Sequence, residues 1–103
     1  MKIRETDIEE LLIIEPSVYK DNRGYFFESY NKGIHLKAGL EHTFIQDNQS
    51  RSSYGVIRGI HLQAKPFAQT KLVRVLEGAI YDVAVDLRQG SSTYGKWFGL
   101  ELS

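Results

Sequence analysis

The segment RGIHLQAKPFAQTK, residues 58–71, places a histidine between an arginine and a lysine in a stretch that otherwise alternates like a β-strand. Arg58, His61 and Lys71 are spread over two predicted strands and a turn, and do not form one run of charge. Such spacing indicates a site that combines cationic groups with a group able to exchange a proton near neutral pH. A structural or surface histidine and a solvated strand-end lysine are the alternatives, and the segment alone leaves them open.

The spacing of Arg58 and His61 would place their side chains on opposite faces of a regular strand. Side chains alternate between the two faces of a strand, so residues an odd number apart point in opposite directions. Gly59 lies between the two residues, and a glycine inside a strand often marks a β-bulge, which changes the count by one. We therefore expect a bulge that turns both side chains into the same cavity.

Composition limits the partners that the chain can have. Thirteen basic residues balance thirteen acidic ones, so no overall field attracts nucleic acid or an anionic membrane, and anion binding requires a local cluster. There is no cysteine, which excludes disulfides, thiolate nucleophiles and the common structural zinc sites, and favours a cytoplasmic location. No apolar run reaches the length of a signal peptide or a membrane span, so we expect neither secretion nor membrane insertion.

The 103 residues predict one domain with a modest core. Short apolar runs separated by turn residues favour an all-β sandwich or barrel. One short helix is expected within residues 30–39, ending at Gly39, although Gly33 weakens it. The predicted strands cover residues 11–16, 25–30, 42–50, 56–63, 71–76, 80–87 and 96–103.

Polar side chains alternate along two of these predicted strands. Gln46 and Asn48 fall on one strand face, and Asp82 and Asp86 fall on one face of a later strand. Paired carboxylates can serve acid–base or metal chemistry. They more often form ion pairs on a polar sheet face, and we favour that interpretation here.

A close resemblance to the dTDP-4-dehydrorhamnose 3,5-epimerase family covers almost the whole chain. It lies in the stretches DNRGYFFES, QDNQSRSSYGVIRGIHLQ, PFAQTKLVRVLEGAIYDVAVDLR and TYGKWFGLELS. The resemblance implies a cupin-like jelly roll of two antiparallel sheets, and a homodimer in which N-terminal strands join the partner's sheet. It also implies a cofactor-free epimerase of dTDP-L-rhamnose biosynthesis, whose dTDP-linked sugar carries a ketone at C4.

The resemblance also implies roles for the residues of the 58–71 segment. His61 matches the family's general base, and an imidazole is well suited to accept a proton at neutral pH. Lys71 matches the residue that stabilises the enolate oxygen formed when the proton leaves. Arg58 matches a position at which a guanidinium binds the diphosphate with forked hydrogen bonds.

Five further residues match substrate-binding positions of the family: Arg23, Phe26, Glu28, Gln46 and Asn48. Arg23 and Glu28 match positions that bind the nucleotide, with Phe26 as an aromatic surface for the base. In the family these residues reach across the dimer interface. Gln46 and Asn48 match a Q-x-N pair, and strand alternation independently places them on one face.

The resemblance does not extend to a catalytic metal. Many cupins hold a metal with an H-x-H pair, but the residue two positions after His61 is Gln63, so we expect no metal. His35 and His42 fit no motif and are interpreted as structural or solvated histidines. Trp97 is interpreted as a packing residue.

Three functional residues of the family lie beyond the part that this chain matches: a tyrosine acid, an aspartate that orients the histidine, and a second histidine. Tyr81 and Tyr94 lie outside the matching motif and are not assigned the role of the acid. We therefore expect the N-terminal part of a longer enzyme, lacking the C-terminal strands of the jelly roll and nearly inactive alone. The alternatives are a non-catalytic cupin that binds nucleotide sugars and a sister enzyme that epimerises only C3 or only C5.

Overall fold

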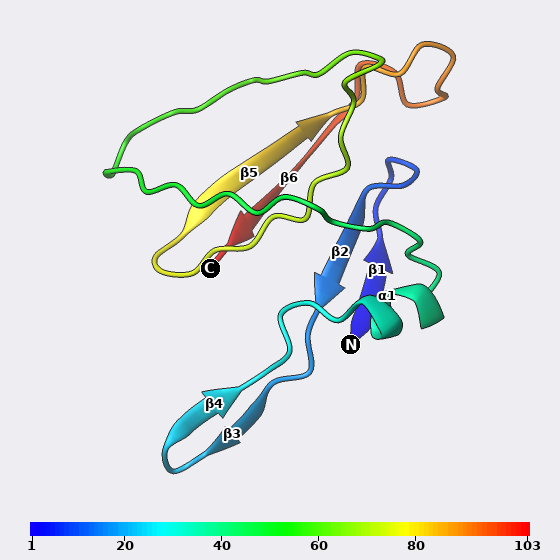
Figure 1. Ribbon diagram of the computed structural model, residues 1–103. Coiled ribbons are helices and arrows are strands. Elements are labelled where there is room, and N and C mark those ends of the chain that lie inside the picture. Colours follow the sequence, from blue (N-terminus) through cyan, green and yellow to red (C-terminus); the bar gives the residue numbers. More distant parts are fainter.

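Three antiparallel hairpins and one short helix make up the regular structure of the chain (Figure 1). The computed structural model describes residues 1–103. The prediction of an all-β chain with a single short helix is confirmed. The elements are β1 (Lys2–Glu5), β2 (Leu12–Glu15), β3 (Tyr19–Asp21), β4 (Gly24–Phe26), α1 (Lys32–Lys37), β5 (Ile80–Val85) and β6 (Trp97–Leu102).

The first hairpin pairs β1 with β2, in a register that places Ile3 opposite Ile14. The sequence pattern predicted the apolar strand β2 but missed β1. Strand β1 has four residues, of which only Ile3 is apolar, and this is a weak signal unless the partner strand is known. A cross-strand ion pair between Arg4 Nε and Glu15 Oε1, 2.7 Å long, adds to the backbone pairing.

The second hairpin, β3–β4, projects away from the rest of the chain (Figure 1). Asp21 pairs with Gly24 across a two-residue turn, and Gly24 has a φ of +135°, which favours glycine. The strand predicted over 25–30 is too long, since β4 ends at Phe26.

Helix α1 begins after Asn31, whose side-chain Oδ1 accepts a hydrogen bond from the Ile34 amide at 3.2 Å. It ends before Gly39, which has a φ of +80°. His35 is buried on this helix. Its Nδ1 donates to the Asn31 carbonyl at 2.9 Å, and the ring of Tyr30 lies 4.8 Å away between centroids. The interpretation of His35 as a structural histidine therefore agrees with its position.

The third hairpin pairs β5 with β6 over six residues each, from Ile80 opposite Leu102 to Val85 opposite Trp97. Both strands were predicted from their apolar and β-branched residues. This hairpin has the longest ladder in the chain.

Residues 41–79 contain no helix or strand, which corrects three predictions. The strands predicted over 42–50, 56–63 and 71–76 are absent. A β-ladder needs a hydrogen-bonded partner, and no other segment of the 103 residues pairs with this stretch. The bulge predicted at Gly59 is absent for the same reason, although this glycine does adopt a positive φ of +139°.

The hydrophobic core is small, as the length of the chain predicted. Ile8 is the one buried apolar residue, whereas Ile45 and Ile57 are each 93% exposed. The radius of gyration is 15.4 Å, above the roughly 13 Å expected for a compact domain of this length. The single helix, α1, has six residues and is not long and apolar enough to cross a membrane.

A cluster of polar side chains around Asp86 joins two of the hairpins. The buried carboxylate of Asp86 accepts hydrogen bonds from the side chains of Arg88, Ser91 and Thr93. Arg88 also donates to Glu10 Oε2 at 2.8 Å and to the Glu9 carbonyl at 3.0 Å. The ion pair favoured for Asp86 is therefore confirmed, and it fixes the β1–β2 loop against the end of β5.

Acid is expected to weaken this connection. Hydrogen bonds from Arg88, and then from Ser91 and Thr93, hold the pKa of Asp86 far below its usual range. A lowered pKa in the folded state contributes stability above the unfolded-state value, about 4, and this contribution is lost progressively as the pH falls below it. Urea midpoints of the intact protein should therefore fall between about pH 4 and pH 2, and Asp86→Asn should flatten this dependence.

The control for this titration is Asp82→Asn, which changes an exposed carboxylate within β5, the strand that Asp86 directly follows. It should leave the slope between pH 4 and pH 2 as in the wild type. An Asp86→Asn variant with the wild-type slope would show that the Asp86 cluster does not stabilise the fold through its charge.

Candidate functional site

A hollow of about 430 Å³ is formed by the β3–β4 hairpin, and we call it the hairpin hollow. Two of the predicted substrate-binding residues, Arg23 and Phe26, line it together with Lys20 and Tyr25. Tyr25 and Phe26 are largely exposed, at 71% and 67%. Cationic groups next to open aromatic surfaces suit a ligand that carries both an anion and a planar ring.

The guanidinium of Arg23 is fixed by the turn from which it projects. Asp21 Oδ2 accepts from Arg23 Nε at 3.1 Å and from Nη2, and Asp21 Oδ1 accepts from the Arg23 amide at 2.8 Å. These bonds from Arg23 lower the pKa of Asp21. Asp21 was not among the predicted site residues, although a D-x-R spacing in a turn is a signal for such a pair.

Three consecutive aromatic residues stand at the end of this hairpin and directly after it: Tyr25, Phe26 and Phe27. The rings of Tyr25 and Phe27 stack, with centroids 6.0 Å apart, and Phe26 lines the hairpin hollow. The guanidinium of Arg74 lies over the Phe27 ring at 6.0 Å. This contact places the segment that follows Lys71 next to Phe27, directly after β4.

Two more predicted binding groups are fixed by local hydrogen bonds. Glu28 Oε1 accepts from Asn31 Nδ2 at 2.9 Å, which ties it to the start of α1. Gln46 Nε2 donates to Asn48 Oδ1 at 3.3 Å. The two amide side chains therefore lie together, as alternation predicted, although their segment is not a strand.

All three predicted site residues of the 58–71 segment are exposed: Arg58, His61 and Lys71. Arg58 donates from Nε to Ser52 Oγ at 2.8 Å and from Nη2 to the Arg51 carbonyl at 3.1 Å, which fixes it to the preceding turn. His61 and Lys71 do not line the hairpin hollow, and they do not line the hollow between Ile8 and residues 96–98. The structure of this part of the chain therefore does not enclose the predicted base and oxyanion group in a common cavity.

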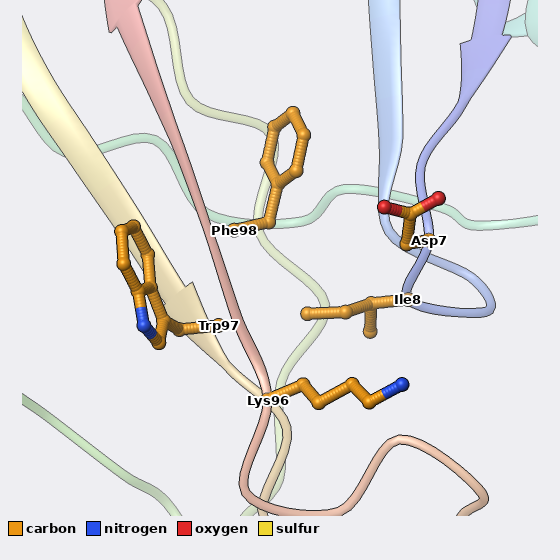
Figure 2. Close-up of a pocket in the computed structure, with 5 residues that line it drawn as sticks. All are labelled: Asp7, Ile8, Lys96, Trp97 and Phe98. Atoms are coloured by element: carbon orange, nitrogen blue, oxygen red, sulfur yellow. The ribbon is translucent and has the colours of Figure 1, made fainter.

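A second hollow of about 460 Å³ lies between the loop after β1 and the start of β6 (Figure 2). Asp7 and Ile8 line one side, and Lys96, Trp97 and Phe98 line the other. This second hollow was not predicted from the sequence, because its two walls are almost ninety positions apart in the chain. It contains none of the predicted site residues. Trp97 was interpreted from the sequence as a packing residue, but it is 64% exposed, which corrects that interpretation. No group of three or more His, Cys, Asp or Glu residues is arranged to hold a metal ion.

Comparison with protein families and curated proteins gives consistent matches. The family model described as dTDP-4-dehydrorhamnose 3,5-epimerase matches residues 5–103. The enzyme of that name from Methanothermobacter thermautotrophicus is 55% identical over 96% of this chain and 53% of its own length. The one from Escherichia coli is 50% identical over all of this chain and 56% of its own length. The chain thus spans about half the length of the curated relatives it matches.

Solved structures agree with this result. The dTDP-4-dehydrorhamnose 3,5-epimerase of Elizabethkingia anophelis is 54% identical, with a TM-score of 0.90 over all of this chain and 57% of its own. The Bacillus anthracis enzyme, solved with TDP and PPi bound, is 48% identical, with a TM-score of 0.94 over 99% of this chain and 59% of its own. The Legionella pneumophila enzyme, solved with dTDP-4-keto-L-rhamnose, is 44% identical, with a TM-score of 0.86 over 99% and 54%.

Proposed function

Because this chain belongs to the dTDP-4-dehydrorhamnose 3,5-epimerase family, we propose that the protein epimerises dTDP-4-keto-6-deoxy-D-glucose at C3 and C5. The observation that carries the proposal is the family match over residues 5–103, a range that contains His61 and Lys71. The enzyme would work in the cytoplasm, without a cofactor or metal.

The C4 ketone explains why no cofactor is needed. His61 takes the proton from the carbon next to the ketone, and the electron pair of the broken C–H bond moves into a C–C double bond, leaving negative charge on the ketone oxygen. The Lys71 ammonium stabilises this enolate oxygen. An acid on the opposite face, to which no residue is assigned, returns a proton to the carbon and inverts its configuration.

The remaining predicted residues bind the nucleotide sugar. Arg23 and Phe26 are supported by their shared position in the hairpin hollow, which offers a cation and an aromatic face to a thymidine nucleotide. Arg58 binds the diphosphate through the donors that Ser52 and the Arg51 carbonyl leave free. Glu28, Gln46 and Asn48 complete the substrate-binding set.

A homodimer with exchanged N-terminal strands would complete this site. The β3–β4 hairpin projects from the chain (Figure 1), and its ring of Phe26 is largely exposed. A projecting hairpin with exposed aromatic residues is well suited to reach a partner, because the partner would cover surface that water otherwise contacts.

The test is hydrogen exchange in the intact polypeptide that carries these residues. Incubated in D₂O with dTDP-4-keto-6-deoxy-D-glucose, it should incorporate deuterium at C3 and C5 and form the doubly inverted sugar, as read by NMR. Exchange at only one carbon would show instead that the protein is a sister enzyme that epimerises only C3 or only C5. Absence of exchange, with dTDP still bound, would establish the second candidate, a non-catalytic nucleotide-sugar-binding cupin, which is favoured by the exposure of His61 and Lys71.

A further inference from the structure

The ion pair between Asp21 and Arg23 leaves one edge of the guanidinium open. Asp21 takes the Nε–H and one N–H of Nη2. A guanidinium carries five N–H donors in a planar fork, so three remain: both on Nη1 and the second on Nη2. One N–H of Nη1 and the second N–H of Nη2 form the outer edge of the guanidinium, which Asp21 leaves unoccupied.

This outer edge is accessible to a ligand. The Arg23 side chain is 90% exposed, and it lines the hairpin hollow beside the exposed rings of Tyr25 and Phe26. Two parallel N–H groups on one edge match the spacing of two oxygens of a phosphate or carboxylate. The geometry therefore allows Arg23 to hold Asp21 on one edge and an anion on the other.

We propose that Asp21 is a positioning residue that fixes the guanidinium of Arg23 so that its outer edge presents paired donors to a phosphate of the bound nucleotide. The inference rests on the proposed nucleotide-binding role of Arg23. An arginine free in solvent has many rotamers, and immobilising it on binding lowers the affinity. Asp21 removes part of that freedom before the ligand arrives.

Two other roles of Asp21 predict different results. As a turn residue, Asp21 accepts from the Arg23 amide through Oδ1, and losing this bond would perturb the hairpin itself. As a bare negative charge, Asp21 would repel the phosphate, so its neutralisation would strengthen binding. A positioning role predicts weaker binding when the charge and the second oxygen are lost but the turn is kept.

Asp21→Asn separates these roles. Asparagine keeps Oδ1 as the acceptor for the Arg23 amide but replaces Oδ2 with an NH₂ group, which cannot accept from the guanidinium. We expect dTDP to bind the intact Asp21→Asn protein about three- to tenfold more weakly by calorimetry, a loss typical of a charge-assisted hydrogen bond to an exposed group. Asp47→Asn, which neutralises another exposed aspartate, is the matched control and should bind dTDP as the wild type does.

A double-mutant cycle with Arg23→Gln tests whether Asp21 acts through Arg23. In the Arg23→Gln protein, adding Asp21→Asn should cause no further loss of affinity. Additive losses, or tighter binding by Asp21→Asn alone, would overturn the positioning role. Wild-type affinity in Arg23→Gln alone would instead overturn the proposed nucleotide-binding role of Arg23, so the two failures are distinguishable.

Discussion

Replacing His61 with alanine is expected to lower proton exchange at C3 and C5 of the keto sugar by at least about 100-fold, the contribution typical of a positioned general base. The affinity for dTDP should remain near that of the wild type, because the imidazole is proposed to act on the hexose and not on the nucleotide. Deuterium incorporation from D₂O, followed by NMR, measures the first quantity, and calorimetry with dTDP measures the second.

His42 provides a matched control, because it is also exposed and lies on the same irregular part of the chain. The His42→Ala enzyme should exchange deuterium at the wild-type rate. If His61→Ala lowered exchange and dTDP affinity by the same factor, the histidine would be holding the ligand or the local structure, and its role as the base would be wrong.

Replacing Lys71 with glutamine is expected to lower kcat by about 100- to 1,000-fold, the range found when one donor to an oxyanion is removed. KM should change much less. The ketone oxygen carries full negative charge only as the enolate forms, so the ammonium interacts more strongly with the transition state than with the bound substrate. Steady-state kinetics of the intact enzyme, with the 4-keto sugar varied, measures both constants.

Lys65→Gln is the control for this variant, since Lys65 is an exposed lysine of the same segment without an assigned role. It should leave kcat unchanged. A Lys71→Gln enzyme with normal kcat and a raised KM would contradict the oxyanion role and indicate that Lys71 contributes only to ground-state binding.

The exposure of His61 and Lys71 affects how large these two mutational effects can be. His61 and Lys71 are exposed, and an ammonium in open water stabilises an enolate far less than one in a water-excluded site. The large effects expected above therefore require that other parts of the assembled enzyme cover residues 58–71. The guanidinium of Arg74 lies over the ring of Phe27, so the neighbouring segment already lies beside the residue that follows β4.

Local features of this protein were determined by the sequence alone. The helix within 30–39, the turn around Gly24 and the strands β5 and β6 depend on caps, glycine conformations and apolar alternation among residues close in the chain. The resemblance carried by residues such as Arg58, His61 and Lys71 depends in the same way on residue types and spacing. Each of these signals is complete within a short window of sequence.

Contacts between distant segments were decided only by the tertiary structure. In the Asp86 cluster, Arg88 binds Glu10, which lies 78 positions earlier in the chain. The residues around Arg88 do not indicate which distant residue it will bind. The strands predicted between 42 and 76 are absent, because alternation indicates which residues suit a strand but cannot provide the neighbour that accepts its hydrogen bonds. The physical reason is the same in both cases: residue spacing sets the local backbone, whereas pairing and enclosure depend on which remote segment arrives beside it.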